Sequence, residues 1–122
     1  MNSCVKWFEI PAADFDRAAK FYSELLDVEL TACDSGDERM AFFPEAEKNV
    51  GGSISWAKDF TPSAHGVMLY FDATGQMAAL LQRVETCGGE VVAPQTVIRA
   101  EGRGSFALFK DTEGNRLGFH AD

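Results

Sequence analysis

Few side chains in this sequence could do chemistry, and Glu9 and His120 are the foremost among them. A carboxylate and an imidazole commonly exchange protons with a substrate, so the two could serve as a general base and its acid partner. Other chemistries lack their motifs. No Cys or His pair has the spacing of a zinc site, and no serine lies in a G-x-S-x-G elbow. Acid–base chemistry is therefore the reaction type that the sequence leaves to consider.

Both residues also have a structural interpretation. Glu9 could form an ion pair with Lys6 or Arg116, or it could lie in water at the rim of a site. His120 is followed by only two residues, in a tail that we expect to fray. These alternatives predict side chains that stabilise the fold or are solvated, and that touch no ligand.

Composition indicates one globular domain over residues 1–122. The net charge of −8 argues against nucleic-acid and membrane partners, because phosphate binding needs clustered Lys and Arg. No apolar run approaches the ~20 residues that cross a bilayer, and no signal peptide is apparent. Cys4, Cys33 and Cys87 are odd in number and widely spaced, so we expect reduced, mostly buried thiols in a cytoplasmic protein.

The first half of the chain predicts a strand, a helix and three further strands. Residues 4–10 are rich in apolar side chains, and Asp14 is a typical N-cap for a helix. Apolar residues then recur at helical spacing as far as Leu26. The further strands are expected over residues 28–32, 40–43 and 53–56, with a loop over residues 44–52.

The second half predicts the same order of elements. A strand over 67–71 precedes a helical stripe that Gly88 and Gly89 end, and a strand over 90–93 follows. The βαβββ order therefore occurs twice, in modules of about residues 1–60 and 61–122. An α+β sandwich without internal symmetry is the alternative. A ferredoxin-like fold fits the later strands less well.

The last two strands of the second module are predicted to form a hairpin. An apolar run from Phe106 meets a polar turn, and a second short run ends on His120. Asp111 and Gly114 have the Asp-x-x-Gly spacing of a type I turn followed by a left-handed residue.

Three stretches, in this order, resemble one known superfamily. They are Trp7-Phe8-Glu9-Ile10-Pro11-x-x-Asp14-Phe15-Asp16-Arg17-Ala18-x-x-Phe21-Tyr22, Val84-Glu85-x-x-Gly88-Gly89-x-Val91 and Phe109-x-Asp111-x-x-Gly114-Asn115-x-Leu117-Gly118. The chain resembles the vicinal-oxygen-chelate superfamily, which includes glyoxalase I, bleomycin-resistance proteins and extradiol dioxygenases. The resemblance implies an α+β, glyoxalase-like fold in which two βαβββ modules form a curved mixed sheet around a groove.

Metal-dependent members of that superfamily hold their metal with His, Gln or Glu side chains on four strands. Carried over by position, the resemblance places these ligands at Trp7, at Met68 or Gly66, at Gly118, and at Gly52 or Ser53. Trp and Gly offer no ligand, and a Met thioether suits soft copper(I). We therefore expect no metal and no other cofactor. A divalent metal held by a displaced set of His65, His120 and Glu9 is the alternative.

The groove that the resemblance implies would be walled by aromatic residues, with a few polar groups to orient a ligand. We expect the ligand to contact Trp7, Ser53, Met68, Tyr70, Arg103 and Arg116. A carboxylate of Glu9 between Trp7 and Tyr70 would be desolvated, which would raise its pKa toward the range of a general base.

Two details of the groove stay open at this point. Either Ser53 and Ser55 or Ile54 and Trp56 face the groove, depending on the strand's orientation. Residues 99–104 form either a lid that binds an acidic group through Arg99 or Arg103, or a solvated hairpin loop.

Taken with the resemblance, these residues predict a protein that binds a small organic molecule without the superfamily's metal. A metal-dependent lyase, isomerase or dioxygenase-type enzyme is the alternative. We expect a homodimer, because a lone open groove would leave apolar surface exposed.

Overall fold

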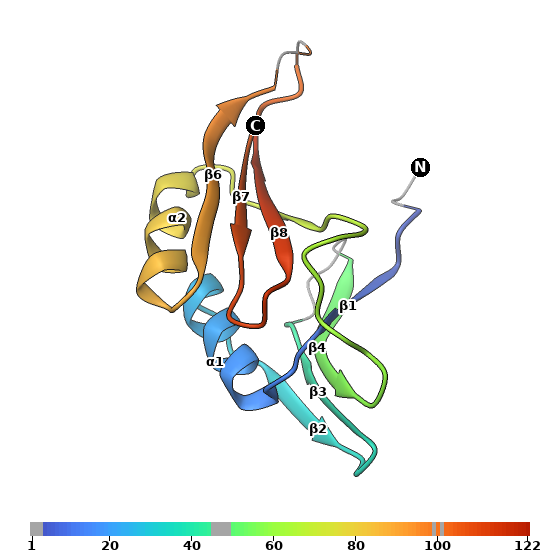
Figure 1. Cartoon of the computed structure of the whole chain (residues 1–122). Helices are drawn as coiled ribbons and strands as arrows, with labels where there is room; N and C mark the ends of the chain where they lie inside the picture. The colour runs from blue at the N-terminus through green and yellow to red at the C-terminus, as the bar shows by residue number, and fades with distance from the viewer. Residues whose placement is uncertain (1–3, 45–49, 99, 101) are drawn as a thin grey trace. The chain divides into compact units, whose positions relative to one another are not determined.

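The computed structural model describes residues 4–44, 50–98, 100 and 102–122. The chain divides into two compact units, Met1–Pro62 (unit 1) and Ser63–Asp122 (unit 2). Figure 1 shows the chain with most of its elements labelled. That the two units act as one domain over residues 1–122 remains a prediction.

Unit 1 has the predicted βαβββ order. Its elements are β1 (Trp7–Pro11), α1 (Phe15–Leu26), β2 (Thr31–Asp34), β3 (Glu38–Phe42) and β4 (Gly51–Ala57). The four strands form one sheet in the order β1-β4-β3-β2, with β1 parallel to β4 and the other pairs antiparallel. The sheet is therefore mixed, as the α+β prediction required.

Helix α1 packs on one face of this sheet. It begins where the Asp14 carboxylate accepts a hydrogen bond from the Arg17 backbone N–H at 3.1 Å, which confirms the predicted N-cap. The side chains that face the sheet are buried, and they are Phe15, Ala18, Phe21, Tyr22 and Leu25. Ile10, Ala41 and Ile54 are buried on the strands. This apolar layer is the core of unit 1.

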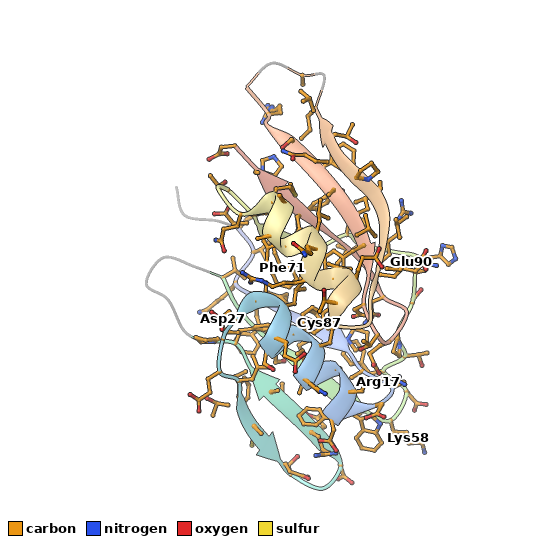
Figure 2. The ribbon with its side chains drawn as sticks, turned by 90° about the vertical axis from the view of Figure 1, so that its left-hand side faces the viewer. Arg17, Asp27, Lys58, Phe71, Cys87 and Glu90 are labelled. Atoms are coloured by element: carbon orange, nitrogen blue, oxygen red, sulfur yellow. The ribbon has the colours of Figure 1, made fainter. Side chains whose placement is uncertain are left out.

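Helix α1 ends at a residue with a left-handed backbone. Asp27 has φ 53° and ψ 54°, and its N–H donates to the Ser23 carbonyl. Figure 2 labels Asp27 at this end of the helix and Arg17 near its beginning. A left-handed conformation is unfavourable for a residue with a Cβ, and a carboxylate is repelled by the negative end of the helix dipole.

Replacing Asp27 by glycine is therefore expected to stabilise the protein by about 1 kcal/mol. Asp27→Asn, which removes only the charge, should give a smaller gain. Denaturant unfolding of the three proteins measures both differences. A loss of stability in Asp27→Gly would show that the Asp27 side chain stabilises this helix end.

Unit 2 repeats the order of unit 1. Its elements are β5 (Tyr70–Asp72), α2 (Met77–Thr86), β6 (Glu90–Val97), β7 (Ser105–Lys110) and β8 (Arg116–Ala121). The sheet order is β5-β8-β7-β6, with β5 parallel to β8. Figure 1 shows β6, β7 and β8 side by side, with α2 along one side of their sheet. The predicted α+β fold, with two βαβββ modules and mixed sheets, is confirmed.

The predicted end of α2 is also confirmed. Gly88 has φ 102°, and the N–H of Gly89 donates to the Val84 carbonyl at 2.8 Å. The N–H of Gly88 donates to the Glu85 carbonyl at 3.3 Å. These two bonds form a Schellman motif, which needs a left-handed residue and therefore favours glycine at Gly88.

The turn of the closing hairpin matches its prediction. Gly114 has φ 89°, and its N–H donates to the Asp111 carbonyl at 3.3 Å. The buried Asp111 carboxylate accepts bonds from the N–H groups of Glu113 and Asn115 at 2.8 and 2.9 Å, and from the Asn115 side-chain amide at 2.9 Å. The Asn115 side-chain oxygen in turn accepts from the Ser63 N–H at 3.0 Å.

Three predicted strands begin later than expected. The strand predicted over 4–10 is β1, Trp7–Pro11. The strand predicted over 28–32 is β2, Thr31–Asp34, and Val28 and Leu30 lie half-buried in the connection from α1. The strand predicted over 67–71 is β5, Tyr70–Asp72, and Val67 before it is fully exposed. The β-forming residues before β5 therefore begin earlier than the stretch that pairs with β8.

Two further expectations were wrong. His120 is not in a frayed tail, because it lies in β8 and is paired with Phe106 of β7 and Asp72 of β5. The thiols are not mostly buried, because Cys4 and Cys33 are exposed and Cys87 is half-buried. In the part of the chain that the structure describes, no helix has the length and apolar character that crossing a membrane requires.

Candidate functional site

The sheet of unit 1 has a second face, directed away from α1, that carries the aromatic and acidic residues of interest. We call it the Trp7 face. Strand register places on it Trp7, Glu9, Met40, Phe42, Gly51, Ser53 and Ser55. Trp7 is 46% exposed, its ring lies 6.0 Å from that of Phe42, and Glu9 is exposed. This face therefore presents an aromatic pair beside a carboxylate.

The sheet of unit 2 has a corresponding face, which we call the Tyr70 face. Register places on it Tyr70, Asp72, Phe106, Leu108, Gly118 and His120. Tyr70 is 44% exposed, and Asp72 is exposed. The opposite face, toward α2, is apolar, with the Phe109 and Phe119 rings stacked 4.6 Å apart.

The two faces share a repeated arrangement. The first strand of unit 1 reads Trp7-Phe8-Glu9, and the first strand of unit 2 reads Tyr70-Phe71-Asp72. In each triplet the aromatic residue and the carboxylate share the open face, because side chains alternate along a strand.

Each aromatic ring covers a glycine of the neighbouring parallel strand. A Cβ at Gly51 would lie 2.9 Å from the Trp7 ring, and a Cβ at Gly118 would overlap the Tyr70 ring. The repeated pairing of an aromatic residue with a carboxylate on each face was not predicted from the sequence. The aromatic–Phe–acid triplet at the start of each module is the signal that could have found it.

The two residues predicted for acid–base chemistry have different surroundings. Glu9 is exposed, so the expected desolvation is absent, and no described residue forms an ion pair with it. His120 Nε2 lies 2.7 Å from the Arg103 carbonyl, so Nε2 carries the proton and donates. Glu9 lies in unit 1 and His120 in unit 2. Their joint role stays a prediction.

The predicted ligand-contacting residues are not equally accessible. Ser53 and Ser55 do share the face of Trp7, which decides the alternative that the sequence left open, but both are buried and their Oγ atoms lie 2.8 Å apart. Met68 lies before β5 and in no strand, so its predicted placement on a strand face was wrong.

The two predicted arginines lie on unit 2. Arg116 is the exposed first residue of β8 and pairs with Lys110. Arg103 is exposed and offers its carbonyl to His120. Arg99, the other residue proposed for a lid, lies outside the described residues.

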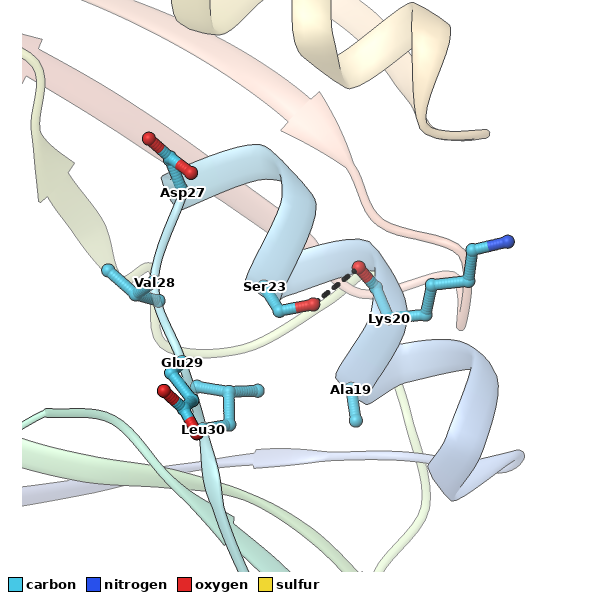
Figure 3. Close-up of a pocket in the computed structure, with 7 residues that line it drawn as sticks. All are labelled: Ala19, Lys20, Ser23, Asp27, Val28, Glu29 and Leu30. Atoms are coloured by element: carbon cyan, nitrogen blue, oxygen red, sulfur yellow. Dashed lines mark hydrogen bonds between the residues drawn. The ribbon is translucent and has the colours of Figure 1, made fainter.

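Two pockets of unit 1 contain none of the residues expected to contact a ligand or exchange protons. The larger, of about 600 Å³, lies between α1 and the segment after it and is lined by Ala19, Lys20, Ser23, Asp27, Val28, Glu29 and Leu30. Figure 3 shows the Ser23 hydroxyl already engaged with the Lys20 carbonyl, at 3.0 Å. This pocket is an open depression, and its one hydroxyl is hydrogen-bonded to the backbone.

The second pocket, of about 390 Å³, is lined by Ala13, Asp14, Phe15, Arg39 and Trp56. Its cation is already neutralised. The Arg39 guanidinium lies 4.4 Å above the Phe15 ring and pairs with Asp16 at 3.1 Å and Asp34 at 3.4 Å. We therefore place the candidate site on the sheet faces.

Asp72 on the Tyr70 face has a pKa below its ordinary value of 3.8. The main cause is the hydrogen bond that the Thr74 N–H donates to its carboxylate at 3.0 Å, followed by the Thr74 hydroxyl. His120 lowers the pKa further. The charged form is thus favoured in the folded protein.

The pKa of Asp72 is lower in the folded protein than in the unfolded chain. The ionised carboxylate therefore stabilises the folded state at pH values above the pKa of the unfolded chain. That contribution is lost as the pH falls below about 4. We expect Asp72→Asn to flatten the acid limb of a plot of melting temperature against pH. NMR titration of the Asp72 carboxyl should give a midpoint below 3.8. A midpoint at or above that value would contradict the hydrogen-bonded geometry.

Comparison with known proteins identifies the family. The family described as the Glyoxalase/Bleomycin resistance protein/Dioxygenase superfamily matches residues 5–119. The chain belongs to that superfamily. The resemblance in the three sequence stretches is thereby confirmed. Among curated proteins, no match was found.

Solved structures of this glyoxalase superfamily and related proteins share the fold. One from Frankia sp. EAN1pec, a glyoxylase/bleomycin resistance protein/dioxygenase domain, has a TM-score of 0.76 at 15% identity, covering 99% of this chain and 98% of its own. FosX from Listeria monocytogenes, a fosfomycin resistance protein, has a TM-score of 0.71 at 17% identity, covering 100% and 95%. The hypothetical protein SA1046 from S. aureus has a TM-score of 0.70 at 18% identity, covering 100% and 99%.

Two of the positions at which the resemblance placed a metal ligand are Trp7 and Gly118. Trp7 and Gly118 have no ligand atom in their side chains, and the ring of Tyr70 occupies the space in front of Gly118. Among the described residues, no group of three or more His, Cys, Asp and Glu could hold a metal ion. Of the displaced set, Glu9 lies in unit 1 and His65 and His120 lie in unit 2, so this alternative stays a prediction.

Proposed function

We propose that this protein binds a small organic molecule against the aromatic sheet faces and does so without the superfamily's metal. The observation that carries the proposal is the repeated aromatic ring over glycine, Trp7 on Gly51 and Tyr70 on Gly118. The resemblance implies that metal-dependent members of the superfamily have a metal-binding side chain at the positions of Trp7 and Gly118. Here a half-exposed ring covers the glycine in each unit, and such rings bind planar and apolar groups.

The proposal is tested by measuring bound metal and the melting temperature with and without Ni, Zn, Mn or Fe. We expect metal well below one equivalent and no rise in melting temperature. A stoichiometric metal that raises the melting temperature would establish the metal-dependent enzyme instead, because a ligand that binds only the folded state stabilises it. A thermal-shift screen of small organic molecules then tests binding itself.

We further propose a homodimer in a reducing, cytoplasmic setting. Large apolar side chains are exposed at Val67, Val92 and Val97, which supports an interface. Cys4, Cys33 and Cys87 are in no disulfide bond, and Cys4 and Cys33 are exposed, which suits a reducing compartment. Sedimentation equilibrium measures the assembly, and a monomer at micromolar concentration would overturn the dimer.

A further inference from the structure

We propose that the Trp7 face selects an organic cation, such as a quaternary or protonated amine. This inference rests on the proposed function and names the class of ligand. The aromatic part of the argument is geometric. Trp7 is 46% exposed, and its ring lies over Gly51 and 6.0 Å from Phe42. A flat, half-exposed indole is the aromatic surface that attracts cations best.

Among the described strand residues, the charge on this face is of one sign. Its strand residues include the exposed carboxylates of Glu9 and Glu38, and the strands β1 to β4 place no Lys, Arg or His on it. Arg39, the basic residue of β3, lies on the opposite face, over Phe15 and beside Asp16. The Glu9 carboxylate is therefore available to a cation that contacts the Trp7 ring.

The Tyr70 face of unit 2 differs from the Trp7 face in its charges and therefore serves as an internal comparison. Its carboxylate, Asp72, already accepts a hydrogen bond from the Thr74 N–H and faces His120 across the strand pair. Its aromatic residue is Tyr70, whose ring attracts cations less strongly than an indole. The two faces have the same arrangement of an aromatic residue and a carboxylate. In the described strand pairs, Glu9 is opposite Ser53, whereas Asp72 is opposite His120.

The test uses choline and its neutral isostere 3,3-dimethylbutan-1-ol, which have the same shape and differ in charge. NMR titration follows the Trp7 indole N–H and the β1 amides. We expect choline to bind at millimolar concentration, roughly fivefold more tightly than the alcohol. Glu9→Gln should weaken choline binding roughly threefold or more and leave the alcohol unchanged. Trp7→Leu should weaken both.

Glu24→Gln is the matched control, because it removes one charge from the exposed side of α1 and leaves the Trp7 face intact. Equal binding of choline and the alcohol would overturn the inference, as would equal effects of Glu9→Gln and Glu24→Gln, or no choline binding at millimolar concentration. If a neutral or anionic compound from the thermal-shift screen binds instead, the ligand class is wrong and the proposed function stands. Stoichiometric metal would overturn the proposed function separately.

Discussion

Replacing Asp111 by alanine is expected to lower the free energy of unfolding by about 3 kcal/mol, the largest single effect that we predict. The carboxylate is buried, and it accepts two backbone N–H groups and the Asn115 amide in the turn between β7 and β8. Without it, these donors lose a charged acceptor inside the fold. The Asn115 side chain would also lose the partner that orients it toward Ser63.

Denaturant unfolding of Asp111→Ala and Asp111→Asn measures this effect. Asparagine keeps one carbonyl acceptor, so its loss of stability should be intermediate, and it provides the readout if the alanine variant does not fold. Asp37→Ala is the matched control, because Asp37 is exposed and its removal changes the net charge equally. A loss below about 1 kcal/mol in Asp111→Ala would show that water replaces the carboxylate.

Gly118→Ala is expected to cost about 2 kcal/mol, because a Cβ at this position has no room. It would overlap the Tyr70 ring and would lie 3.0 Å from the Ala107 carbonyl oxygen. Tyr70 is 44% exposed, so its ring can turn outward and limit the cost. The carbonyl belongs to the backbone of β7 and cannot move as freely.

A double-mutant cycle isolates the ring's part in this cost. In a Tyr70→Ala background, Gly118→Ala should cost at least about 1 kcal/mol less than in the natural sequence. Thermal or denaturant unfolding of the four proteins gives the coupling energy. Additive losses would show that the ring does not rest on Gly118, and the observation behind the proposed function would fall with it.

Local signals predicted much of the fold. Asp14 predicted the start of α1 because its side chain can cap a free N–H there, and Gly88 and Gly114 predicted left-handed positions because they have no Cβ. The starts of β2 and β5 were predicted less well. Whether Val28 or Val67 joins a strand depends on a partner strand far away in the sequence.

For the candidate site, too, local sequence patterns predicted one part and distant contacts decided the rest. Alternation along the strand predicted that Trp7 and Glu9 share a face, but not that Glu9 is exposed. It gave no hint that His120 donates to the Arg103 carbonyl, 17 residues away. The burial of Ser53 could not be read from its neighbours in sequence either.

The sequence by itself determined the family, the twice-repeated order of elements, and the absence of ligand side chains at Trp7 and Gly118. These follow from residue types and spacing, which are local properties of the chain. Only the tertiary structure decided what lies against Gly51 and Gly118. The pairing of β1 with β4 and of β5 with β8 brings an aromatic ring over each glycine, and parallel pairing joins residues that are far apart in the sequence.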